Sequence, residues 1–259
     1  MIRELMDSLP LWNVLVVTII CVLLAIELGY RVGLWRRTHI EFDSEALLSS
    51  MTGAHLALLA FILAFSFSMA AGHHSARKQM SLEEANAIST AYLRAGLVQA
   101  EQGQTLERLL VEYTSLRAQV RNRSEAATTI ARSEALQDAM WVQVEALAAD
   151  RDPDEFDALL VDAINEVFDV HERRVAAGLR NRVPPTLWAT LFLLLPLSMI
   201  GIGYFSGIKG ARNPIASTGL ALSFSLVIFM IADLDRPSSG LMMADRSAIT
   251  DLEKRLSDP

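Results

Sequence analysis

The chain has 259 residues, of which 52% are hydrophobic, and it carries a formal net charge of −7. A nucleic-acid-binding protein would need a basic face, so the negative charge argues against a nucleic-acid partner. The single cysteine, Cys21, excludes a disulfide framework.

Four strongly apolar stretches contain no Asp, Glu, Lys or Arg: Pro10–Ile26, Ala46–Gly72, Val183–Ile208 and Asn213–Ala232. Each is near or above the ~20 residues that an α-helix needs to cross ~30 Å of hydrocarbon. Backbone amides cannot remain unpaired in lipid, so the spans are expected to be helices. We therefore predict an all-α polytopic membrane protein with transmembrane helices over residues 10–30, 46–72, 184–208 and 213–235. The first stretch is expected to be a retained span and not a signal peptide, because Arg31, Arg36 and Arg37 follow it as a stop-transfer cluster.

Residues 73–183 differ in composition, with 13 basic and 18 acidic residues, which indicates a water-exposed domain. Apolar residues recur every three or four positions over 106–120 and 156–170, which predicts helices. We expect a bundle of about four helices inserted between spans two and three, followed after span four by a tail over 236–259. Its first helix should run on from span two as far as Gly96. Gly103 is also predicted to break that helix, and Asp152-Pro153-Asp154 to begin the last one.

The second span carries two distinct patterns of side chains. Small residues recur on it at spacings of three or four, a pattern that lets membrane helices approach closely. These residues are Gly53, Ala57, Ala60, Ala64, Ser68 and Ala71. Beside them, Phe61, Phe65 and Met69 stand at i, i+4 and i+8 as one bulky stripe. The stripe either faces lipid or packs in a core, or it forms in an oligomer a constriction that gates ions by dewetting. His55, Ser66 and Ser68 would give this helix some wettable surface.

Charged residues stand at the ends of the spans. They are Glu27 at the end of the first and Asp233, Asp235 and Arg236 at the end of the fourth. Charges so close to hydrocarbon are usually paired or line a water-filled path. One possibility is a local ion pair between Asp235 and Arg236. The alternatives are an acidic ring in an oligomer and an ion pair between two helices. Because both acids cannot pair with Arg236 in one geometry, we predict that Asp235 contacts Arg77 or Lys78, which follow span two.

No catalytic or metal-binding set can be assembled from the sequence. His73-His74 sits where span two leaves the lipid and is typical of an interfacial polar collar. His171 has no His or Cys at the helical i, i+4 spacing that a zinc site favours. We therefore predict no enzyme activity, no metal site and no cofactor.

Two segments make the chain similar to a known family. LEEANAISTAYLRA (Leu82 to Ala95), together with the small and Phe-rich span before it, and DLDRPSSG (Asp233 to Gly240) resemble bacterial four-span proteins of the bestrophin-like family. Four spans, a helical region between spans two and three and the apolar stripe are also similar to bestrophins. Bestrophins are pentameric anion channels whose second span lines the pore, so the resemblance implies a homo-oligomeric channel, a pentamer if the likeness extends that far. The dense acidic run with which animal bestrophins bind calcium has no counterpart here.

An even number of spans places both termini and the middle domain on one side of the membrane. Nine basic residues near the membrane flank that side and five flank the other, which favours a cytoplasmic middle domain in a bacterial inner membrane. The first set is Arg3, Arg77, Lys78, Arg173, Arg174, Arg180, Arg182, Arg236 and Arg246, and the second is Arg31, Arg36, Arg37, Lys209 and Arg212. The short loops are denser in basic residues, which favours the reverse orientation.

The leading hypothesis is therefore a homo-oligomeric channel with membrane lipid and small inorganic ions as its other partners. The resemblance implies anions. Glu27, Glu83, Glu84 and the Asp233/Asp235 pair would favour cations if they faced the pore. The rival is a non-conducting, membrane-anchored interaction or sensor module.

Overall fold

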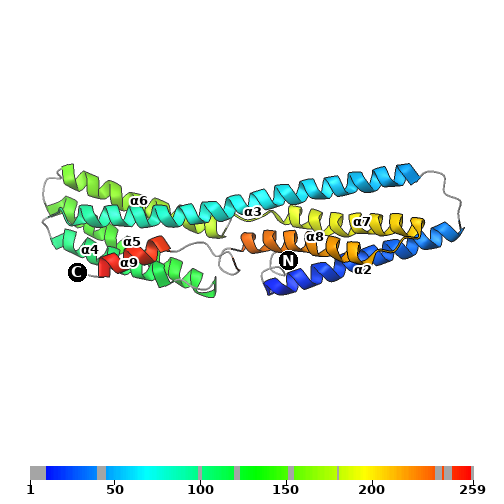
Figure 1. Cartoon of the computed structure of the whole chain (residues 1–259). Coiled ribbons are helices and arrows are strands. Elements are labelled where there is room, and N and C mark those ends of the chain that lie inside the picture. The colour runs from blue at the N-terminus through cyan, green and yellow to red at the C-terminus, as the bar shows by residue number, and fades with distance from the viewer. Residues whose placement is uncertain are drawn as a thin grey trace. The chain divides into compact units, whose positions relative to one another are not determined.

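A computed structural model of the chain describes residues 10–39, 45–98, 101–119, 123–150, 155–179, 181–236, 241 and 247–257 (Figure 1). Over these residues the regular structure is helical and includes no strand, which confirms the predicted all-α class. Four helices are long and apolar enough to cross a membrane. Several positions used above lie outside the described residues: Arg3, Asp152-Pro153-Asp154, Arg180, residues 237–240 and Arg246.

The four candidate spans are α2 (Leu11–His39), α3 (Glu45–Ala95), α7 (Pro185–Lys209) and α8 (Pro214–Asp235). The remaining described helices are α4 (Glu101–Gln119), α5 (Arg123–Asp150), α6 (Glu155–Leu179) and α9 (Ser247–Ser257). Two spans are parts of longer helices. α2 continues past residue 30 to His39, and α3 runs unbroken from the apolar stretch into the charged region.

Local signals explain most helix ends. α3 ends at Ala95, immediately before Gly96, as expected. The prediction that Gly103 breaks this helix was wrong, because Gly103 lies in the first turn of α4. A Cβ on Gly103 would fall 2.8 Å from the carbonyl oxygen of Ala95, so the glycine allows a close approach between α4 and the end of α3. α7 begins at Pro185, whose missing N–H is no loss in the first helical turn.

The connection between α7 and α8 is short, and its own residues end the first helix and begin the second. Gly210 ends α7 with φ of 67°, a left-handed conformation that glycine adopts without steric penalty. Asn213 then caps α8, its side-chain oxygen accepting a hydrogen bond from the Ala216 N–H at 3.1 Å. Pro214 occupies the first helical position.

The described residues form two compact units. Residues 10–72, 182–236 and 241 make the first, which we call the membrane unit, and residues 73–181 with 247–257 make the second, the middle unit. The membrane unit has an apolar core to which α2, α3, α7 and α8 all contribute, with Leu59, Leu191 and Ile228 fully buried.

The middle unit has a separate core. It is built from the second part of α3 together with α4, α5, α6 and α9, and Ile88, Leu110 and Ile164 are fully buried in it. The sequence interpretation assigned only a tail to the segment that holds α9. Ile249 and Leu252 of that helix are 1% exposed, and Glu253 accepts a hydrogen bond from Ser115 of α4 at 2.9 Å.

Candidate functional site

The apolar stripe of span two lies on a face of α3 that its own chain leaves uncovered. Phe61 is 66% exposed and Phe65 is 49% exposed, whereas Leu59 and Leu63 on the opposite face are at most 4% exposed. Met69 is half-buried. The stripe therefore does not pack in the core of this chain, which leaves lipid or another copy of the chain to cover it.

The small residues of span two share this exposure. Gly53, Ala57, Ala60, Ala64 and Ser68 are exposed, and a Cβ built on Gly53 would meet no other atom within 4 Å. His55 is also exposed, and its Nδ1 lies 2.9 Å from the Met51 carbonyl oxygen one turn earlier. Ala71 is half-buried and packs against the apolar core, and Ala60 and Ala64 line a cavity of 470 Å³ with Phe224 and Val227 of α8. Most of the small face is therefore open within one copy.

The close contact between spans is made instead by glycines that the sequence interpretation did not use. Gly29 and Gly33 of α2 and Gly203 and Gly207 of α7 form two G-x-x-x-G motifs, one on each helix. A Cβ on Gly203 would overlap the carbonyl oxygen of Ile26, and the other three glycines face opposing backbone in the same way. The signal that would have found this contact is the G-x-x-x-G spacing within an apolar span.

Glu27, at the edge of the first span, is paired as expected for an acid near hydrocarbon. Its two carboxylate oxygens lie 2.8 Å from Arg31 Nε and 2.8 Å from Arg212 Nη2. Arg212 comes from the connection between α7 and α8 and lies 5.5 Å from the centre of the Tyr30 ring. These residues line a cavity of 570 Å³ at this end of α2, α7 and α8.

The acids at the end of α8 are buried and paired. Asp235 is 2% exposed and accepts hydrogen bonds from the Val183 N–H at 2.7 Å and from Arg182 Nη2 at 3.2 Å. Asp235 therefore reaches beyond its own helix end, to residues that precede α7. The partner that the structure gives Asp235 is Arg182, which the sequence interpretation did not consider. A contact with Arg77 or Lys78 stays a prediction.

The other residues of the predicted membrane-edge network have different environments. Asp233 is 2% exposed, and its carboxylate accepts a hydrogen bond from the Leu241 N–H at 2.8 Å. Arg236 is buried and its N–H donates to the Asp233 carbonyl oxygen. Arg77 is 6% exposed, whereas Lys78 is exposed.

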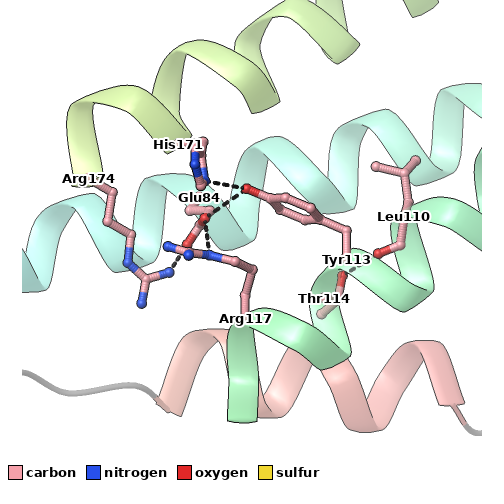
Figure 2. Close-up of polar contacts among 7 residues, drawn as sticks. All are labelled: Glu84, Leu110, Tyr113, Thr114, Arg117, His171 and Arg174. Atoms are coloured by element: carbon pink, nitrogen blue, oxygen red, sulfur yellow. Dashed lines mark hydrogen bonds and ion pairs between the residues drawn. The ribbon is translucent and has the colours of Figure 1, made fainter. Parts of the chain in front are cut away.

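The middle unit contains a buried ionic cluster built around Glu84 of α3 (Figure 2). Glu84 is fully buried, and its Oε1 accepts hydrogen bonds from Arg117 Nε at 2.9 Å and from the Tyr113 hydroxyl at 3.2 Å. Its Oε2 pairs with Arg174 of α6. Tyr113 Oη also lies 2.9 Å from His171 Nδ1. One carboxylate thus joins α3 to two guanidinium groups from α4 and α6.

Burial sets the protonation states around this carboxylate. Desolvation lowers the pKa of His171 to about 4, helped by the positive charge of Arg117, so the imidazole is neutral at pH 7. Desolvation also raises the pKa of Tyr113 to about 12, so the phenol keeps its proton. The cluster therefore holds its charge on Glu84 and the arginines, with neutral Tyr113 and His171 as hydrogen-bonding partners.

The structure gives no support to a catalytic or metal-binding role for these side chains. Across the described ranges, no group of three or more His, Cys, Asp or Glu residues comes together as a metal site requires. His171, weighed as a metal ligand from the sequence, instead contacts Tyr113. No sequence signal marked Glu84, Arg117 and Arg174 as partners, since they come from three helices far apart in the chain.

The fold and the sequence of this chain are similar to those of a known protein family. A four-span, all-α membrane protein is the class that the structure defines. The family model of the Bestrophin-like domain matches residues 15–249, so the chain belongs to the Bestrophin-like domain family, whose members are in general channel-type membrane proteins. No curated protein matches the sequence.

Solved structures show the same fold at low sequence identity. Two variants of a bacterial bestrophin homologue from Klebsiella pneumoniae are 16% identical to this chain, with TM-scores of 0.69 and 0.67. The match to the first covers 96% of this chain and 98% of the variant. The match to the second covers 95% of this chain and 97% of the variant. A structure described as a membrane protein is also 16% identical, with a TM-score of 0.67 and coverage of 96% and 97%.

Proposed function

We propose that the protein is a homo-oligomeric ion channel in which α3 of each copy lines the pore. The observation that carries this proposal is the uncovered face of α3, where Phe61 is 66% exposed and Phe65 is 49% exposed in a single copy. Repeated around a symmetry axis, this stripe forms a ring of bulky apolar side chains, a structure that gates ion flow by dewetting.

The rest of the same helix face fits a pore better than lipid. Many exposed positions of the other spans are bulky and apolar, such as Leu193 and Leu197 of α7, which are 68% and 48% exposed, although Ser223 of α8 is exposed as well. On α3, by contrast, exposed Ser68 follows the two phenylalanines at helical spacing, and exposed Ser75 and Gln79 continue that spacing beyond Gly72. Hydroxyl and amide groups are wettable, so a water-filled path explains them.

Most of the acids considered from the sequence are paired or buried, and the half-exposed Glu83 accepts a hydrogen bond from the Gln79 amide. Glu84 is fully buried against Arg117 and Arg174. Asp235 is buried against Arg182, and Glu27 binds two arginines. The argument for a cation channel rested on these carboxylates facing the pore. We therefore propose anions as the conducted species, in agreement with the family resemblance.

Ion flux into liposomes tests this function. We expect purified protein reconstituted in liposomes to conduct chloride, and the triple variant Phe61→Ala, Phe65→Ala, Met69→Ala to conduct faster, because the dewetted ring is removed. The matched control is Leu193→Ala, Leu197→Ala. It also removes exposed bulky residues at i, i+4, but from α7, and it should leave the flux unchanged.

Two outcomes would contradict the proposal. Near-zero flux from both the wild type and the triple variant would support the rival function, a membrane-anchored interaction module. A faster flux from the α7 control than from the α3 variant would mean that α3 does not line the conducting path. Sodium flux in place of chloride flux would keep the channel and reverse the ion choice.

We further propose that the protein is in the bacterial inner membrane with both termini and the middle unit in the cytoplasm. The excess of basic residues on that side supports this orientation. Reporter fusions after Lys209 and within 101–104 should report opposite sides of the membrane, the second one cytoplasmic. A shared side would contradict the four-span topology, and exchanged sides would reverse only the orientation.

A further inference from the structure

The cavity beside Glu27 combines two chemically different halves. Its inner part is lined by apolar side chains of three spans, such as Leu23, Ile202 and Leu220. Its outer part is lined by Arg31 and Arg212, with Tyr30 beside them. The volume is 570 Å³, and all of these residues belong to the membrane unit. A cavity that is apolar inside and cationic at its mouth matches the two ends of a lipid molecule.

The charges at the mouth leave a surplus that an anion can use. Glu27 binds both arginines, one through each oxygen, so two positive groups are balanced by a single negative one. The Arg31 and Arg212 side chains remain 76% and 64% exposed and keep further N–H donors for a ligand. The carboxylate fixes the two guanidinium groups at one place, and the Arg212 guanidinium lies over the Tyr30 ring.

We propose that this cavity is a binding site for an anionic phospholipid, with the phosphate at Arg31 and Arg212 and an acyl chain along the apolar part. Guanidinium groups are suited to phosphate because they donate two parallel hydrogen bonds. Basic pockets between membrane helices recognise anionic head groups on the cytoplasmic side of membranes. The same chemistry applies at the opposite side, where the proposed orientation puts this cavity. The apolar lining distinguishes this ligand from free inorganic phosphate, which would leave that half of the cavity unused.

The test is lipid retention by purified full-length protein in native mass spectrometry. The protein is exposed to equal amounts of phosphatidylglycerol and phosphatidylcholine with identical acyl chains. We expect phosphatidylglycerol to be retained preferentially. Arg212→Gln and Arg31→Gln should each lower its retention about fivefold, since a basic residue near the membrane surface contributes about 1 kcal/mol. Glu27→Gln should raise retention, because it leaves both arginines free for the phosphate.

Arg37→Gln is the matched control. Arg37 is an exposed arginine on α2 that is not part of the cavity lining, so its removal takes one positive charge from the same helix end and none from the lining. Its effect should be much smaller than that of Arg31→Gln. Equal retention of the two lipids, or equal effects of the Arg37 and Arg31 substitutions, would overturn the proposal.

A competition experiment distinguishes the phosphate of a lipid from that of a soluble anion. Inorganic phosphate and glycerol 3-phosphate at millimolar concentration should fail to displace the lipid, because they lack the acyl chain. Displacement by either would overturn the lipid assignment in favour of a soluble anion. The readout is lipid binding and not ion flux, so failure here leaves the proposed channel function standing, and failure of the flux experiment leaves this site standing.

Discussion

The two units of this protein each contain a helix contact of a kind opposite to that of the other. In the membrane unit, Gly29 and Gly203 let the backbones of α2 and α7 touch without any polar side chain between them. In the middle unit, Glu84 and two arginines join three helices through charge. The difference follows from the solvent in which each unit folds.

Lipid offers spans no hydrophobic driving force for association, because lipid tails are as apolar as the side chains. Close van der Waals packing over small residues then becomes the main source of stability. In water the hydrophobic core already drives folding, and a buried ionic group adds a strict requirement for partners, because removing one partner leaves a charge desolvated. The glycine contact between α2 and α7 should therefore be sensitive to added volume, and the Glu84 cluster to lost charge.

The largest expected effect is the loss of the central carboxylate of the middle unit. Glu84→Gln removes the charge that neutralises Arg117 and Arg174, so we expect destabilisation by about 3–5 kcal/mol. The measurement is thermal unfolding of the purified protein followed by circular dichroism. Glu83→Gln is the matched control, because Glu83 is the adjacent residue but is half-exposed and accepts a hydrogen bond from the Gln79 amide. Equal shifts in melting temperature for the two variants would show that the cluster does not stabilise the unit.

A smaller effect is expected from adding one methyl group between the spans. Gly203→Ala places a Cβ against the Ile26 carbonyl oxygen, and backbone cannot move aside as a side chain can, so we expect a loss of about 3 kcal/mol. Gly201→Ala on the same helix is the control, since its Cβ would meet no atom within 4 Å. That change should be neutral or stabilising, because alanine is the better helix former. Equal thermal stability of both variants in detergent would contradict the proposed glycine contact.

The smallest predicted effect is a dependence of the stability of the middle unit on pH. Because burial lowers the pKa of His171 to about 4 from its usual 6.5, the unfolded chain binds a proton there more readily than the folded chain. The stability linked to His171 is therefore complete above pH 6.5 and is lost progressively as the pH falls through 4. Between about pH 7 and pH 4.5, the melting temperature of the wild type should fall further than that of His171→Gln. Parallel curves for the two proteins would refute this contribution.

Much of the fold followed from properties that are local in the sequence. The four spans were predicted because hydropathy over ~20 residues decides whether a helix can cross the membrane, whatever surrounds it. The end of α3 at Gly96 and the start of α7 at Pro185 were predicted because the conformational preferences of glycine and proline act at their own positions. Gly103 shows the limit of that argument, since its role is a close approach to Ala95 and not a helix break.

The candidate sites depended on the tertiary structure to a much greater extent. Exposure of Phe61 and Phe65 could not be read from their i, i+4 spacing, because the same spacing describes a core, a lipid face and a pore. Asp235 had several basic residues within reach on sequence grounds, and only the packing of α8 against the start of α7 selected Arg182.

Glu84 marks the boundary between the two kinds of information most clearly. Glu84 and the adjacent Glu83 carry the same charge and lie on the same helix. The rotation of α3 against its neighbours buries Glu84 between Arg117 and Arg174 and leaves Glu83 half-exposed. Ion pairing depends on distance in space between groups that are far apart in the chain, and helical periodicity alone does not specify that distance.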